Sequence, residues 1–163
     1  MMAKIRAENR KLRAQLKQRR LKRKCRNFNR AKNLAIGHRG DKEVHVGRGV
    51  FLPIPMYDTI VSQSKSGQQF VRGISAAIFG YETLAKCSVT GKFCNRTKTI
   101  KPQLDPTKLR AVKDIYRHYL ESKLMPQNDV EYELEKTHMY IARKIADVCK
   151  QQKKTDREEN DKT

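Results

Sequence analysis

The segment from Arg72 to Leu120 constrains the fold of this chain most. It starts in an apolar helical stretch, passes through a glycine-containing loop rich in lysine and arginine, and re-enters a helix at Asp105-Pro106. That helix start has a physical basis. An N-cap aspartate accepts hydrogen bonds from free backbone amides, and a proline at the first helical position gives up no hydrogen bond. The order of helix, basic loop and helix therefore predicts a mainly helical domain with a cationic surface loop.

Hydrophobic periodicity supports a helix on each side of the loop. Before the loop, apolar residues recur at the spacing of one helix face: Phe70, Ile74, Ala77 and Ile78. Gly80 should interrupt this helix, with a further turn or two of helix over residues 81–87. After the loop, the buried face is predicted to contain Leu109, Val112, Ile115, Tyr116, Tyr119 and Leu120. A last helix is expected after Pro126, with Asn128 as its cap and Glu131 completing a capping box.

Two short strands are expected before these helices. Alternating apolar residues and glycines over residues 44–47 and 49–53 predict a β-hairpin, followed by a short helical turn over 56–61. We therefore expect a mainly α fold: a compact helical domain with a short β-hairpin over residues 43–150, preceded by a basic N-terminal helix over 1–26. Residues 27–42 read as a linker. Residues 151–163 read as a disordered charged tail because they contain few apolar residues.

The positive charge of the chain lies mainly at its N-terminus. The 163 residues include 37 Lys and Arg against 17 Asp and Glu, a net charge of +20. Residues 1–32 alone contain 14 bases and one acid, Glu8, whereas residues 125–163 contain 8 bases and 9 acids. This excess far exceeds what solubility requires and favours a polyanionic partner.

The N-terminal region combines a heptad pattern with a basic cluster. Four residues recur at the spacing of a coiled-coil seam: Ile5, Asn9, Leu12 and Leu16. Asn9 falls at an a position of the heptad, where an asparagine favours a parallel homodimer. A solvated basic helix with incidental leucines explains the same residues, so dimerisation stays open. A nuclear-import signal, a phosphate-binding arm, or both, are predicted at Arg19, Arg20, Lys22, Arg23, Lys24 and Arg26.

Three further pieces occur in a fixed order along the domain: the aromatic-ended helix at Ile78-Phe79, the turn Ser88-Val89-Thr90-Gly91-Lys92, and Lys101-Pro102-x-Leu104-Asp105-Pro106-x-Lys108-Leu109. Together they resemble the BEN domain, a small DNA-binding module of chromatin-associated and transcription-regulating proteins. The resemblance extends from about Val44 to about Lys150. It implies a BEN-type fold, sequence-specific binding of double-stranded DNA, transcriptional repression with co-repressor proteins as partners, and a nuclear location.

The last helix is the first candidate for contact with DNA. Its apolar stripe is predicted to contain Val130, Leu134, Ile141, Ile145 and Val148. The opposite side is predicted to present Lys136, Met139, Tyr140, Arg143 and Lys150, with Lys144 on the flank. The resemblance implies that this C-terminal helix contacts DNA, and Arg143 suits a base edge because its planar fork can make two bonds to guanine. An ordinary charged outer face explains much of the same pattern.

The loop from Thr90 to Lys101 is the second candidate. It contains four bases, Lys92, Arg96, Lys98 and Lys101. Gly91 and Asn95 can adopt turn conformations that bring backbone amides near phosphate. Such a loop can lie along a DNA backbone or enter the minor groove. A merely solvated loop is the alternative.

The sequence lacks motifs for catalysis, cofactor binding or metal binding. Its four histidines lie far apart, without a suitably spaced acid or nucleophile, and no glycine-rich phosphate-binding motif occurs. Its four cysteines, Cys25, Cys87, Cys94 and Cys149, show no metal-binding spacing. No apolar run is long enough to span a membrane. We therefore expect neither an enzyme nor a membrane partner.

Two other functions fit the same composition. An RNA-binding basic protein is favoured by the arginine-rich arm and disfavoured by the lack of aromatic clusters for stacking on single strands. The other is a protein-interaction adaptor that uses a coiled coil for partners and a BEN-like domain that binds protein instead of DNA. Competition among duplex DNA, scrambled duplex and RNA distinguishes all three functions.

Overall fold

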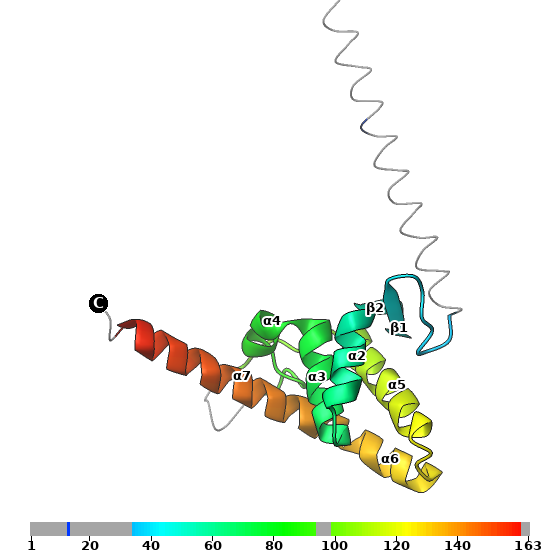
Figure 1. The fold of residues 1–163 in the computed structure, drawn as a ribbon. Coiled ribbons are helices and arrows are strands. Elements are labelled where there is room, and N and C mark those ends of the chain that lie inside the picture. Colours follow the sequence, from blue (N-terminus) through cyan, green and yellow to red (C-terminus); the bar gives the residue numbers. More distant parts are fainter. Residues whose placement is uncertain (1–12, 14–33, 94–98, 161–163) are drawn as a thin grey trace, which may run out of the picture. The chain divides into compact units, whose positions relative to one another are not determined.

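The computed structural model describes residues 13, 34–93 and 99–160 of the chain (Figure 1). The predicted dimer seam, the basic cluster at 19–26, and Arg96 and Lys98 of the loop lie outside these residues. By its internal contacts the chain divides into two units, Met1–Leu34 and Ala35–Thr163.

A β-hairpin opens the domain, as the sequence predicts. Strand β1 (Glu43–Gly47) pairs antiparallel with β2 (Val50–Pro53), with Val44 opposite Leu52. Arg48 and Gly49 connect the strands, and both have positive φ, as the tight turn of a two-residue hairpin requires. His45 is buried and holds this turn: its Nδ1 donates to Ala35 O over 3.2 Å, and its Nε2 accepts from Gly49 N over 3.3 Å.

The predicted linker is part of the domain from Ala35 onward. Arg39 forms an isolated bridge with Val44, and Gly37 N donates to His45 O over 2.8 Å. The Arg39 guanidinium also pairs with Asp58 of the next helix, with 2.6 Å between nitrogen and oxygen. These contacts with the hairpin, which no sequence periodicity indicates, extend the folded unit beyond the predicted boundary at residue 43.

Six helices complete the described part of the domain: α2 (Ile54–Gln63), α3 (Gly67–Phe79), α4 (Tyr81–Lys86), α5 (Pro106–Ser122), α6 (Gln127–Glu135) and α7 (Thr137–Asn160). The helices expected around the basic loop are confirmed. Asp105 caps α5 as predicted, with its side chain accepting from the backbone nitrogens of Thr107 and Lys108. Helix α2 is longer than the expected turn because Pro55 stands in its first turn, where proline favours helix initiation.

The core forms around α3, which packs against α2, α5 and α7 (Figure 1). Phe70 of α3 is fully buried and stacks on Tyr119 of α5, with ring centroids 4.0 Å apart. All six residues predicted for the buried face of α5 are buried. No helix in the described part of the chain is both long and apolar enough to cross a membrane.

The C-terminal region differs from the sequence expectation in two ways. The single predicted helix is divided into α6 and α7. The N-cap of α6 is Pro126 and not Asn128, and no side chain caps this helix. Glu131 does not complete a capping box but pairs with Arg117 of α5. Helix α7 also continues through residues 151–160, where the composition favoured a disordered tail. The segment from 137 to 160 contains neither glycine nor proline and is rich in helix-favouring residues, so nothing in it ends the helix early.

Candidate nucleic-acid interface

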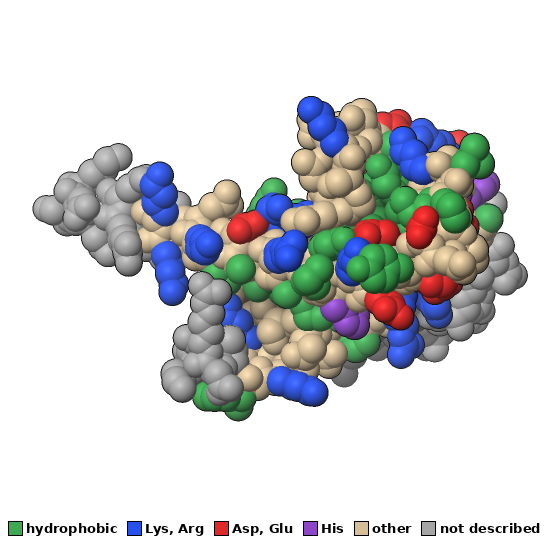
Figure 2. Space-filling model, turned by 90° about the horizontal axis from the view of Figure 1, so that it is seen from below, with side chains coloured by type: hydrophobic (Ala, Val, Ile, Leu, Met, Phe, Trp, Pro, Cys, Tyr) green, Lys and Arg blue, Asp and Glu red, His purple; other side chains and the backbone are tan. Residues whose placement is uncertain are grey.

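Helix α7 has one face in the core and one face open to solvent. It packs on α3 and α4, and Ile141 and Val148 are buried in that contact. The exposed face, here called the outward face, contains Met139, Ala142, Arg143, Ala146, Lys150 and Lys153. In Figure 2 Lys and Arg side chains follow the elongated part of the molecule that holds α7, whereas most Asp and Glu side chains gather at the other end, near α6.

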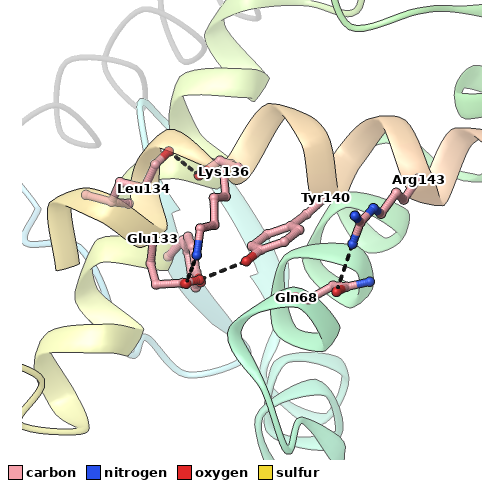
Figure 3. A network of polar contacts seen from close by, with 8 residues as sticks. Gln68, Glu133, Leu134, Lys136, Tyr140 and Arg143 are labelled. Carbon is pink, nitrogen blue, oxygen red and sulfur yellow. Dashed lines mark hydrogen bonds and ion pairs between the residues drawn. The ribbon is translucent and has the colours of Figure 1, made fainter. Parts of the chain in front are cut away.

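The orientation of α7 depends on a break in the helix at Lys136. The carboxylate of Glu133, at the end of α6, accepts hydrogen bonds from three donors: Tyr116 over 2.8 Å, Tyr140 over 3.0 Å and Lys136 over 2.8 Å. Figure 3 shows Lys136 and Tyr140 directed at this carboxylate. The contacts join α5, α6 and the first turn of α7, so they fix the angle at which α7 leaves α6.

The electrostatics of this network favour a charged carboxylate. Partial burial acts to raise the pKa of Glu133, but the hydrogen bonds from Lys136, Tyr116 and Tyr140 outweigh it, and the pKa lies below its ordinary value of 4.5. Burial, followed by the hydrogen bond to Glu133, raises the pKa of Tyr116 well above its ordinary value. Both tyrosines therefore stay neutral donors to a charged acceptor.

The structure places three residues of this region differently from the prediction. Tyr140, expected on the open side, is buried, and its hydroxyl donates to Glu133, whereas Ile145 of the predicted apolar stripe is only partly buried. Lys136, predicted to contact DNA, precedes α7; it is paired with Glu133, and its Nζ lies 3.7 Å from the centre of the Tyr132 ring. Of the cations predicted on the opposite side of the last helix, Arg143 and Lys150 are on the outward face.

Arg143 and Asp147 both lie beside α3. The Arg143 guanidinium is exposed and donates from Nη1 to Gln68 Oε1 over 3.3 Å (Figure 3). Asp147 forms an ion pair with Arg72 of α3. This pair neutralises a carboxylate that would otherwise repel a polyanion near the outward face. Lys144, predicted on the flank, lies with its Nζ 5.0 Å from the centre of the Tyr81 ring.

The loop after α4 is closed at its base by Ser88. Its backbone accepts from Leu104 N over 2.9 Å and donates to Pro102 O over 2.8 Å, and its hydroxyl accepts from Gly91 N over 3.0 Å. Gly91 has a φ of 70°, and an added Cβ would lie 3.2 Å from the Cβ of Gln103. A glycine is therefore required at this turn, which is part of the motif identified in the sequence.

The two described lysines of the predicted loop site differ in their surroundings. Lys92 is exposed. Lys101 is partly buried, and its ammonium donates to Ala85 O at the end of α4 and to Cys149 Sγ of α7 over 3.3 Å. Lys101 thus satisfies a free carbonyl at a helix C-terminus and joins the loop to α7.

A cavity of about 310 Å³ separates the loop from α7, and we call it the lysine cleft. Its described lining includes four lysines and no acidic residue: Lys92, Lys101, Lys150 and Lys153. Ala142, Ile145 and Ala146 of α7 also line it. A second hollow of about 460 Å³ adjoins it, with Val89, Phe93 and Met139 in its lining. Cations and small side chains of α7 therefore share one concave surface.

The sequence analysis missed two features of this surface. Lys153 lies in the segment predicted as a disordered tail, although the absence of glycine and proline as far as residue 160 is a signal that α7 continues. Ala142 and Ala146 give no signal in the sequence, because alanine fits either face of a helix. Their exposure lets a bulky partner approach the backbone of α7 closely.

The fold and the site define a small, mainly helical domain with a hairpin at its start and a cationic, partly hollow surface beside its last helix. Residues 69–145 match the family model of the BEN domain, and the chain therefore contains a BEN domain. The resemblance stated from the sequence is confirmed.

Two known proteins are similar to this chain, one in sequence and one in fold. It is 28% identical over 121 residues to BEN domain-containing protein 5 of Xenopus laevis, a match that covers 73% of this chain and 30% of that protein. The chain thus spans less than a third of the length of this relative. Its fold is similar to that of the insv-BEN domain, whose crystal structure is a complex with its DNA target site; the TM-score is 0.59 at 22% identity, covering 74% of this chain and 99% of that one.

Proposed function

We propose that this chain binds double-stranded DNA sequence-specifically through the outward face of α7 and the adjoining loop. The observation that carries the proposal is the outward face itself, where Arg143, Lys150 and Lys153 surround two exposed alanines. An α-helix fits the major groove of B-DNA, and the nearby carboxylate, Asp147, is already paired with Arg72. The insv-BEN domain, a neighbour in fold, is described in complex with a DNA target site.

The cations have different roles in this proposal. Arg143 is the candidate for base recognition, because its exposed guanidinium can make two parallel bonds to guanine and its present partner, Gln68, is a neutral side chain. Lys92, Lys150 and Lys153 suit phosphate, which they reach as point charges from two sides of the lysine cleft. Lys136 and Lys101 have a supporting role, since their ammonium groups are engaged within the domain.

The test starts with selection of a preferred duplex by the full chain from a random library. Affinity is then compared for that duplex, a scrambled duplex and RNA of the same length at physiological salt. A preference for the selected duplex supports the proposal. Equal or tighter binding of RNA favours the RNA-binding alternative, and no binding of any nucleic acid favours the adaptor; either result rejects DNA recognition.

Arg143→Ala then tests which residue recognises bases. We expect it to weaken binding of the selected duplex by about 1–3 kcal/mol and binding of scrambled duplex far less. Lys113→Ala is the matched control, because it removes one exposed positive charge from α5, which packs on β1, α3 and α6. If Arg143→Ala leaves the ratio of selected to scrambled affinity unchanged, α7 contacts only phosphate.

We further propose that the chain acts in the nucleus as a transcriptional repressor, with co-repressor proteins as partners. This proposal is supported by the BEN domain and by the basic cluster at residues 19–26. A reporter gene with copies of the selected duplex should be repressed by the full chain and less so by its Arg143→Ala variant. Activation of the reporter, or a cytoplasmic location of the tagged chain, contradicts the respective part of the proposal.

A further inference from the structure

Besides its four lysines, the lysine cleft is lined by two thiol groups. Cys149 of α7 and Cys87 at the end of α4 are both free and partly buried, and both line the cavity. The sulfur of Cys149 lies 3.3 Å from the ammonium nitrogen of Lys101 and 3.7 Å from the carbonyl oxygen of Ala85. DNA binding by the outward face gives these thiols no role.

The surroundings of Cys149 favour a negatively charged reagent. A small molecule that reaches its sulfur through the lysine cleft meets Lys92, Lys150 and Lys153, and no acid occurs among the described residues of the lining. A cleft lined by charge of one sign raises the local concentration of oppositely charged ligands. The volume of about 310 Å³ lies at the lower end of the range of small-molecule sites.

The Lys101 ammonium supports a reaction at this sulfur. The nucleophile in thiol–disulfide exchange is the thiolate, and the Lys101 ammonium lies within hydrogen-bonding distance of this sulfur. Lys101 already donates to Cys149 Sγ, so no rearrangement of the cleft is needed to place the cation.

We propose that Cys149 is a site of reversible S-thiolation by anionic low-molecular-weight disulfides, of which oxidised glutathione is the probe. Cys149 loses its proton to solvent, and its sulfur attacks one sulfur of the disulfide. A new S–S bond forms as the old one breaks, and the second half of the reagent leaves as a thiolate that takes a proton from water. The disulfide is itself the oxidant, and excess thiol reverses the step.

The adduct has a consequence for the proposed DNA interface, and this part rests on the proposed function. A glutathionyl group carries two carboxylates and one ammonium, so it would bring one net negative charge into the lysine cleft and offset part of the charge of Lys92, Lys150 and Lys153. The same group would stand beside Ala142 and Ala146 on α7. Thiolation of Cys149 therefore lowers affinity for duplex DNA, and reduction restores it.

The experiment uses the full chain with Cys25→Ser and Cys94→Ser, which leaves Cys87 and Cys149 as the thiols. After incubation with oxidised glutathione, intact mass and peptide mapping should show one glutathionyl group on Cys149, removable by dithiothreitol. Adding Cys149→Ser should abolish the adduct, whereas adding Cys87→Ser should retain it. An adduct on Cys87 alone, no adduct, or an internal Cys87–Cys149 disulfide overturns the proposal.

Three comparisons test the role of the lysines. Cystamine, a cationic disulfide, should react on the order of tenfold more slowly than oxidised glutathione at low salt, and the difference should shrink at high salt. Lys150→Gln with Lys153→Gln should slow the glutathione reaction without slowing cystamine. Lys101→Met should slow both reagents. Equal rates for the two disulfides reject the cleft as an anion-selective site.

Duplex binding is measured in parallel on the modified and reduced protein. A fall in affinity on thiolation that dithiothreitol reverses supports the regulatory role, and unchanged affinity overturns that role. The mass measurement does not depend on DNA. If the reduced chain binds no duplex, the proposed function fails on its own, and the modification site is still decided.

Discussion

At the scale of single residues, Glu133 links the elements that position the outward face of α7. One carboxylate accepts from Tyr116 of α5, Tyr140 of α7 and Lys136 between the last two helices. A glutamine in its place keeps one acceptor oxygen and loses the charge that Lys136 pairs with. Since charge-assisted hydrogen bonds are stronger than neutral ones, a neutral amide cannot hold α7 at the same angle equally well.

We predict that Glu133→Gln lowers the free energy of unfolding by about 1–3 kcal/mol, measured by urea denaturation. Glu131→Gln is the control, because Glu131 forms an exposed ion pair with Arg117, and such pairs contribute about 0–1 kcal/mol. A smaller effect at position 133 than at 131 contradicts the assigned role of the network.

The same residue predicts a dependence of stability on pH. Because the folded-state pKa of Glu133 is depressed below 4.5, its charged form stabilises the folded state above that pH. This contribution is lost as pH falls from 4.5 through the folded-state pKa. Unfolding of the wild-type chain and of Glu133→Gln, followed as a function of pH, should therefore differ by a constant amount near neutrality and converge in acid. A difference that grows on acidification contradicts the depressed pKa.

At the scale of helices, strands and loops, the sequence predicted those elements whose position depends on interactions between residues close together in the chain. Helices α3 and α5 follow from apolar periodicity and from a cap at Asp105 that the structure shows. The break between α6 and α7 does not follow, since Lys136 is compatible with a continuous helix. The break accompanies hydrogen bonds between Glu133 and residues of neighbouring helices. The burial of Tyr140 likewise goes with a contact outside its own helix, the hydrogen bond to Glu133, which periodicity within one helix cannot show.

The candidate site was predictable to the same extent. Arg143 and Lys150 could be placed on the outward face from helical spacing alone, and the structure exposes both. The contacts of Lys101 with Ala85 and Cys149 could not be predicted from the sequence, because these residues lie 16 and 48 positions away from Lys101 in the chain. Contacts of this kind depend on the whole domain, so charge in the sequence overestimates the number of cations that face a partner.

The loop gives a prediction at this scale. Gly91→Ala should destabilise the domain by about 1–2 kcal/mol, because alanine is strained at a φ of 70° and its Cβ would crowd Gln103. Gly40→Ala is the control, since its nearest neighbour would lie at an ordinary contact distance of 3.5 Å. Thermal unfolding of the two variants measures the difference. Similar melting temperatures would contradict the tight closure of the loop by Ser88 and Gly91.

At the scale of the whole molecule, charge is distributed unevenly along the chain. Helix α6 contains four acids and no base, Asp129, Glu131, Glu133 and Glu135, whereas the outward face of α7 is cationic (Figure 2). A polyanion is therefore attracted to α7 and repelled from α6, which orients it on the domain. The largest charge density lies elsewhere, in residues 17–32, which contain nine Lys and Arg and no acid.

These residues should provide affinity without specificity. Contacts between lysine or arginine and phosphate release counterions whatever the bases are, so they strengthen binding to every duplex and make it depend on salt. We predict that deletion of residues 17–32 weakens binding to the selected and scrambled duplexes by similar factors and flattens the dependence of log affinity on log salt. Replacement by an uncharged segment of equal length is the control for lost length. Loss of the preference for the selected duplex with an unchanged salt dependence would show instead that this segment recognises bases, and Arg143 would no longer account for specificity alone.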